Sequence, residues 1–151
     1  MNLQLKYKEE VENVKCDDIN EEEAEQYKEL AEQMIEFAVQ NGGMGLSAPQ
    51  IGIHKKLIVW EGKEDTFHIG FNPSYYADGK DTNTVEGCLS YPDEQYFLTR
   101  KKSIRAVYYA LNQGGKLVKI TRKMINDEAI VFAHETDHIN GITIAMIGKK
   151  L

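Results

Sequence analysis

The chain has 151 residues, of which 42% are hydrophobic and 28% charged, and its formal net charge at pH 7 is −6. These values are typical of a soluble globular protein, and we expect one domain over residues 1–151. The negative charge gives no basic footprint for nucleic acid, and no run approaches the roughly 18 apolar residues of a membrane span. We therefore expect neither nucleic acid nor a membrane as a partner.

The first ten residues carry four charged side chains and no apolar core, which predicts no secretion signal and a cytoplasmic protein. The chain has two cysteines, Cys16 and Cys88. A single disulfide between them stays open, but in a reducing cytosol an isolated cysteine is more often a free thiol or a metal ligand.

The first predicted element is a helix that begins after Asn20. Three glutamates follow this asparagine, and Glu23 stands at the position that completes a capping box. Apolar residues then recur at helical spacing until the segment 41–43, Asn-Gly-Gly, ends the helix. Its glutamate-rich face is interpreted as a solvated surface.

The middle of the chain is typical of strands, and the end is typical of a helix. Short segments rich in β-branched and aromatic residues occupy 57–60, 67–71, 104–111 and 117–121, with a predicted hairpin loop at 112–115. We then expect Asn126 to cap a second helix that contains residues 134–138. A helix, several strands and then a helix form the pattern of an α+β domain, which is the predicted fold class.

The second helix carries the sequence His-Glu-Thr-Asp-His at 134–138. Two histidines four residues apart share one helix face, so both imidazoles can reach one metal ion. Glu135 lies beside them, close enough to take a proton from a water on that ion. The alternative is a buried helix face with two hydrogen-bonded histidines, because so short a pattern also arises by chance.

A catalytic metal site usually has three protein ligands and one open position, so a third ligand is needed. Only thirteen residues follow His138, and they offer no obvious candidate. Cys88 is the attractive one, because Gly87 beside it allows a close backbone approach. A thiolate would favour Zn²⁺ or Fe²⁺ over Mg²⁺ or Ca²⁺. A lone cysteine is otherwise most often an inert core residue.

A third informative segment, 43–50, is rich in small residues and ends at Gln50. Such a backbone could lie against a ligand, with the Gln50 amide as a donor. A tight turn after the first helix explains the same residues equally well, and the segment lacks the lysine of a phosphate-binding loop.

Together the three segments resemble the peptide deformylase family. Its motifs are Gly-x-Gly-x-Ala-Ala-Pro-Gln, Glu-Gly-Cys-Leu-Ser and His-Glu-x-x-His, which match residues 43–50, 86–90 and 134–138 in that order. The likeness extends over about residues 22–141. It implies an α+β fold with antiparallel sheets packed around a C-terminal metal-binding helix, together with an N-terminal helix. It implies a hydrolase that removes the formyl group from N-terminal formylmethionine of nascent chains.

The resemblance assigns roles to matching residues. It implies metal binding by Cys88, His134 and His138, with Glu135 as the general base and then the acid. It implies that the Gln50 side chain and the Leu89 backbone N–H stabilise the oxyanion. The implied substrate contacts are the Gly45 backbone and an apolar pocket for the methionine side chain, lined by Met44, Ile130 and Val131. Glu86 is expected to form an ion pair with Arg100 behind the metal ligands. The implied cofactor is one divalent ion, with Fe²⁺ expected in vivo and Ni²⁺, Co²⁺ or Zn²⁺ as alternatives.

Several features depart from the family pattern. Ser47 replaces an alanine, Thr136 replaces a commonly apolar residue, and Gln95 stands near a position where many bacterial members have arginine. The sequence also stops ten residues after Gly141. Ribosome docking through a C-terminal helix is therefore not carried over, and the short form resembles the compact deformylases of bacteriophages. A monomer is expected.

Two rival functions remain from the residues alone. A metalloprotease would need a third ligand further along the chain and would give Cys88 no role. A catalytically silent binder of formyl-peptides or metal would be expected to have lost a ligand or the base, yet all of them are present. His54 and His68 are expected to be structural or exposed.

Overall fold

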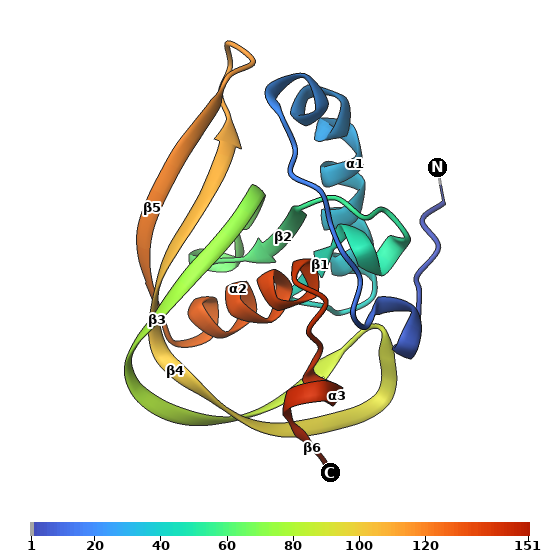
Figure 1. Ribbon diagram of the computed structural model, residues 1–151, viewed down its shortest axis with the longest axis vertical. Coiled ribbons are helices and arrows are strands. Elements are labelled where there is room, and N and C mark those ends of the chain that lie inside the picture. The colour runs from blue at the N-terminus through green and yellow to red at the C-terminus, as the bar shows by residue number, and fades with distance from the viewer. Residues whose placement is uncertain (1) are drawn as a thin grey trace.

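The computed structural model describes residues 2–151 and has an α+β fold (Figure 1). The N-terminal helix α1, Glu21–Gln40, begins at Asn20, whose side chain accepts a hydrogen bond from the Glu23 N–H at 2.9 Å. The predicted capping box is present. The helix ends at Asn41, and Gly42 follows with a φ of 70°, so the predicted stop is confirmed.

The strands form one antiparallel sheet with the order β1-β2-β3-β4-β5, and β6 pairs with β4. Their bounds are Gly45–Ser47 for β1, Leu57–Glu61 for β2, Phe67–Cys88 for β3, Tyr91–Leu111 for β4, Leu117–Ile125 for β5 and Lys149–Lys150 for β6. The β4–β5 hairpin turns through residues 112–115 as predicted. Strand β1 lies at one end of this order, so one of its backbone edges is not paired within the sheet.

The second helix, α2, spans Asn126–Ile139 and crosses the middle of the molecule, inside the curve of the long strands β3 and β4 (Figure 1). A short helix, α3, Ile144–Ile147, follows it. Within residues 2–151, no helix is long and apolar enough to cross a membrane.

Strand β2 shows why the core has two sides. Successive side chains of a strand point to opposite faces. Accordingly, Leu57 and Val59 pack in the apolar cluster that includes α1, while Ile58 and Trp60 pack in the cluster that includes α2. Both faces of β2 are covered, and its run of four apolar residues is therefore fully buried. The Trp60 ring meets that of Phe132 edge-on at 4.9 Å, which anchors α2 to the sheet.

One prediction of local structure was wrong, and another was correct in place but too short. The residue at the cap position of α2 is Ile125, and Asn126 is the first helical residue, with a φ of 54°. No side-chain capping bond forms there, because the isoleucine side chain has no hydrogen-bond acceptor. The strands predicted at 67–71 and 104–111 are also only parts of β3 and β4, which continue to Cys88 and back from Tyr91 as one long hairpin.

Candidate metal centre and active site

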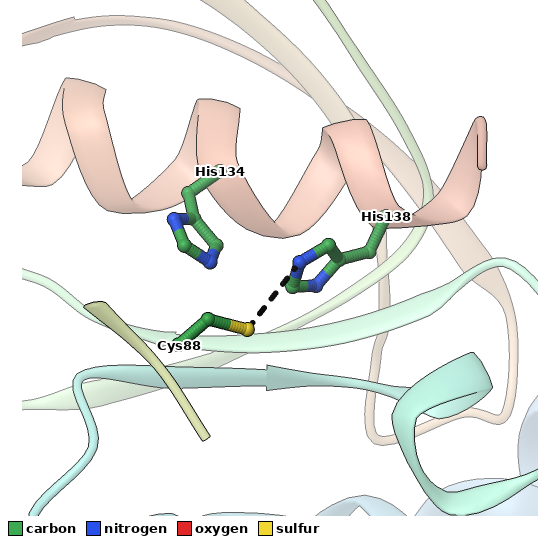
Figure 2. Close-up of side chains that lie close together, drawn as sticks. All are labelled: Cys88, His134 and His138. Carbon is green, nitrogen blue, oxygen red and sulfur yellow. Dashed lines mark hydrogen bonds between the residues drawn. The ribbon is translucent and has the colours of Figure 1, made fainter. Parts of the chain in front are cut away.

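Three soft donors from two elements converge at one point. Cys88 is the last residue of β3, and His134 and His138 lie one turn apart on α2 (Figure 2). Their ligand atoms all lie within 4.8 Å of one another, and Cys88 Sγ is 3.7 Å from His138 Nε2. One thiolate and two imidazoles form the three-ligand set that zinc and ferrous ions accept, so the residues fit a single divalent ion.

The surroundings of Cys88 favour its thiolate. Burial by itself would raise the pKa of this thiol, but the charges and hydrogen bonds of His138 and His134 outweigh burial and lower the pKa to about 6. Because a metal ligand must be deprotonated, the lowered pKa favours the form of Cys88 that binds a cation.

His134 is oriented by a carboxylate on its far side. Its Nδ1 lies 2.9 Å from Glu86 Oε1, and Arg100 binds Glu86 through two contacts, Nε–Oε2 at 2.6 Å and Nη2–Oε1 at 2.9 Å. The predicted Glu86–Arg100 pair is therefore confirmed, and it is buried. With Nδ1–H donating to Glu86, Nε2 is the nitrogen of His134 that remains for an ion.

His138 is held in the same tautomer. Its Nδ1 lies 3.1 Å from Gln50 Oε1, 3.2 Å from Glu135 Oε1 and 3.1 Å from Ser47 Oγ. An amide oxygen and a carboxylate only accept hydrogen bonds, so Nδ1 carries the hydrogen. Burial alone would lower the pKa of this ring, but the Cys88 thiolate and Glu135 raise it to about 9, so without an ion Nε2 also carries a proton and faces Cys88. A bound ion would take the place of that proton.

Gln50 and Glu135 flank the metal ligands. Gln50 lies in a short 3-10 helix, Ala48–Ile51, and its Nε2 is 3.5 Å from Cys88 Sγ. Glu135 is only 5% exposed and lies against β1. A Cβ atom at Gly45 would stand 2.7 Å from Glu135 Oε2 and 3.0 Å from the Val59 carbonyl oxygen. Only glycine leaves room there for the carboxylate beside the strand.

A cleft of about 1050 Å³ opens onto this group. It brings together the residues that the sequence proposed for substrate, base and oxyanion roles: Met44, Gly45, Gln50, Leu89, Ile130, Val131 and Glu135. Cys88 and His134 line it too, and Met44 is 46% exposed at its rim. The histidines set aside from the sequence lie elsewhere, since His54 is exposed and His68 stacks on Trp60 at 5.4 Å.

The structure adds residues that sequence reasoning did not place. Asp137 contacts Arg100, with Oδ2 at 3.2 Å from Nη1, and its Oδ1 accepts a hydrogen bond from the Tyr75 hydroxyl at 2.7 Å. The place of Asp137 three residues after His134 is the sequence signal that could have pointed to a role beside the metal ligands. Its partners, however, come from distant strands. Ser47, noted only as a departure, contacts both His138 and Gln50. Cys16 and Cys88 are both free within the described residues, so the disulfide that the sequence left undecided does not form.

Comparisons with known proteins agree with this geometry. A family model described as polypeptide deformylase matches residues 3–150. The chain is 35% identical over 119 residues to a peptide deformylase of Hamiltonella defensa, and the matched segment covers 78% of this chain and 67% of the relative. It is 38% identical over 128 residues to one of Halothermothrix orenii, covering 81% of this chain and 80% of the relative.

Solved structures show the same fold. The peptide deformylase of Thermotoga maritima superposes with a TM-score of 0.81 at 28% identity, over 97% of each chain. A probable peptide deformylase of Synechococcus phage S-SSM7 gives a TM-score of 0.78 at 30% identity, over 95% of this chain and 98% of that one.

Proposed function

The chain belongs to the polypeptide deformylase family, and on that premise we propose that it hydrolyses the N-formyl group of N-terminal formylmethionine on nascent chains in the cytoplasm, with formate as a product. One observation carries the proposal most directly. The donors Cys88, His134 and His138 meet at a cleft that also presents Gln50 and Glu135.

Cys88, His134 and His138 would hold one divalent ion. When bound, such an ion polarises a carbonyl and makes a neighbouring water more acidic. We propose Fe²⁺ as the ion used in vivo, which is what the resemblance to the family implies. Ni²⁺, Co²⁺ and Zn²⁺ are alternatives, because the thiolate and two imidazoles accept each of them.

Glu135 moves the proton. In the proposed reaction its carboxylate takes a proton from the attacking water, whose oxygen forms a bond to the formyl carbon. The same residue then delivers the proton to the departing amine nitrogen as the C–N bond breaks, which leaves formate and a free amino terminus. Its burial beside His138 keeps the carboxylate next to the metal ligands throughout.

Two donors would stabilise the negative charge that develops on the formyl oxygen. The Gln50 side chain presents its Nε2 beside Cys88, and the Leu89 backbone N–H lies in the turn after it. Preorganised donors of this kind are typically worth about 3 kcal/mol of transition-state stabilisation each.

The cleft suits an extended peptide. The free edge of β1 at Gly45 can pair with a substrate backbone, as an added strand would. Met44, Ile130 and Val131 give the cleft an apolar lining for the methionine side chain. A formyl group at the head of such a strand would then reach the metal ligands.

The deciding experiment is an anaerobic assay of Fe²⁺- or Ni²⁺-loaded protein on formyl-Met-Ala-Ser. We expect stoichiometric release of formate and of a free amine. The unformylated peptide Met-Ala-Ser serves as the control, and cleavage of its peptide bonds would favour a metalloprotease. Folded, metal-loaded protein that binds the formyl-peptide without releasing formate would support the silent binder instead.

A further inference from the structure

The hydroxyl of Ser47 lies between a metal ligand and the proposed oxyanion donor. Ser47 is the last residue of β1 and is fully buried. Its Oγ is 3.0 Å from Gln50 Oε1 and 3.1 Å from His138 Nδ1. One small side chain thus contacts two groups of the proposed site, the metal ligand His138 and the oxyanion donor Gln50.

The directions of these hydrogen bonds follow from the groups present. The Ser47 backbone N–H donates to Gln50 Oε1 at 3.0 Å, which identifies that end of the amide as the oxygen. An amide oxygen only accepts, so the Ser47 hydroxyl donates to it as well. A hydroxyl has one hydrogen, and its oxygen is then left to accept from His138 Nδ1–H.

These bonds fix which end of the Gln50 amide faces the site. Two donors from Ser47 hold Oε1, and Nε2 therefore turns toward Cys88 Sγ at 3.5 Å and donates to Ser90 Oγ at 3.1 Å. A flipped amide would set its NH₂ against an N–H and an O–H. With alanine, the residue of the family pattern at this position, the hydroxyl donor would be lost, and only the backbone N–H and His138 Nδ1–H, 3.1 Å from Oε1, would oppose the flip.

The same hydroxyl helps to hold His138. By accepting from Nδ1–H, it restrains the ring and keeps Nε2 facing Cys88, 3.7 Å from its Sγ. Hydrogen-bond partners of metal-binding histidines typically change metal affinity by about 10- to 100-fold. His138 has two further acceptors, Gln50 and Glu135, so the lower end of that range applies.

We propose that Ser47 is a positioning residue that couples the metal ligand His138 to the oxyanion donor Gln50. The hydroxyl orients both side chains through one hydrogen-bonded chain, from His138 Nδ1–H to Ser47 and from the Ser47 hydroxyl to Gln50. The Gln50 half of the proposal rests on the proposed function, whereas the His138 half concerns metal binding alone.

The test is Ser47→Ala, which removes the hydroxyl and adds no atom to a buried position. Co²⁺ affinity is measured anaerobically by competition with a chromophoric chelator, together with the visible spectrum of the Co²⁺ protein. We expect the Co²⁺ dissociation constant to rise about tenfold and the Co²⁺ absorption bands to shift. In the formate-release assay we expect kcat to fall about fivefold, the equivalent of one hydrogen bond, with little change in KM.

Two further variants separate positioning from general packing. Thr136→Val removes another buried hydroxyl near the site, one that has no hydrogen-bond partner among residues 2–151. It should leave the Co²⁺ dissociation constant and kcat unchanged. In a Gln50→Ala background, Ser47→Ala should no longer lower kcat, because the amide that it orients is gone.

The results distinguish the two proposals. A Ser47→Ala protein whose Co²⁺ affinity, spectrum and kcat all match the wild type would overturn the positioning role, even if its thermal stability changed. Wild-type protein that binds Co²⁺ but releases no formate would instead defeat the proposed function. The comparison of Co²⁺ affinities would then still decide whether Ser47 orients His138.

Discussion

The Glu135 carboxylate contacts the metal ligand His138 on the same helix and also faces the cleft. It is buried against Gly45, with Oε1 3.2 Å from His138 Nδ1. A carboxylate in this place can exchange protons with groups in the cleft but is not one of the three converging donors. The proposed proton transfer can therefore be separated from metal binding by changing one atom.

Glu135→Gln keeps the size of the side chain and removes its ability to accept a proton. We expect metal content to stay near one ion per chain, while kcat falls by about 10²- to 10⁴-fold, the usual contribution of a general acid or base. Metal analysis and the formate assay on the same sample measure both quantities. Full turnover by a metal-loaded Glu135→Gln protein would refute the acid–base role.

The roles of individual residues were predictable from sequence only where a motif carries them. Cys88, His134 and His138 stand in motifs, and the structure brings their donor atoms together. Asp137 stands inside a motif as well, but its contacts depend on Tyr75 and Arg100, which the fold brings from β3 and β4. Contacts of this kind have no local signature in the chain.

At the scale of elements, the metal site depends on how α2 sits against the β3–β4 hairpin. The hairpin carries Cys88, and the helix carries both histidines. A buried chain of charges joins the two: Arg100 of β4 binds Glu86 of β3 and Asp137 of α2. Because His134 binds Glu86 as well, the helix is tied to the hairpin at two points three residues apart.

Asp137→Asn should weaken one of these ties. The neutral amide loses the ion pair with Arg100, and we expect the free energy of unfolding to fall by roughly 2 kcal/mol and metal affinity to fall with it. Chemical denaturation and chelator competition measure the two effects. Asp81→Asn is the matched control, because it removes the same charge from an exposed pair with Lys101 in the same hairpin and should cost less than about 1 kcal/mol.

The contact between α2 and β5 should make stability depend on pH. Burial alone would raise the pKa of Glu128, but hydrogen bonds from Arg122 and Trp60 hold it below its ordinary value of 4.5. A lowered pKa means that the carboxylate contributes stability above pH 4.5 and loses that contribution as the pH falls through the lower, folded-state value.

Glu128→Gln is therefore expected to reduce the free energy of unfolding at pH 7 by about 2 kcal/mol. The difference from wild type should shrink as the pH is lowered below 4.5, because protonation then removes the same charge from the wild type. Urea denaturation across this range measures it. A difference that stays constant down to the acid limit of folding would contradict the role of Glu128.

The elements were predicted unequally, for a physical reason. Helix α1 has a recognisable cap, β2 is an apolar run that reflects its burial, and β5 follows a recognisable turn. The middle of the β3–β4 hairpin does not, since most of the β3 residues from 76 to 85 are exposed. A hairpin with little apolar periodicity is held by its backbone ladder, which leaves no pattern in the side chains.

Over the whole molecule, the distribution of charge bears on which peptides the cleft accepts. Among the described residues, its lining includes Asp93 and Asp127 but no lysine or arginine. Both aspartates are exposed, and neither forms an ion pair within residues 2–151. The net charge of −6 adds to the negative potential at the entrance.

We therefore expect formyl-Met-Ala-Lys to have a KM about two- to fivefold lower than formyl-Met-Ala-Glu at low ionic strength. Added salt should reduce the ratio, because the aspartates are screened by solvent ions. Steady-state kinetics with the two peptides measure it, and the double variant Asp93→Asn, Asp127→Asn should bring the ratio toward one. Equal KM values for both peptides at low salt would show that the entrance charges have no influence.

The separation of the metal donors along the chain has a consequence for biosynthesis. Cys88 is made before β4 and β5, whereas α2 follows all the strands from β1 to β5. A growing chain therefore exposes its thiol for as long as the two imidazoles are still to be translated. The full set of donors for an ion exists only once His138 has been translated, and until then the thiol has no metal to shield it from oxidants.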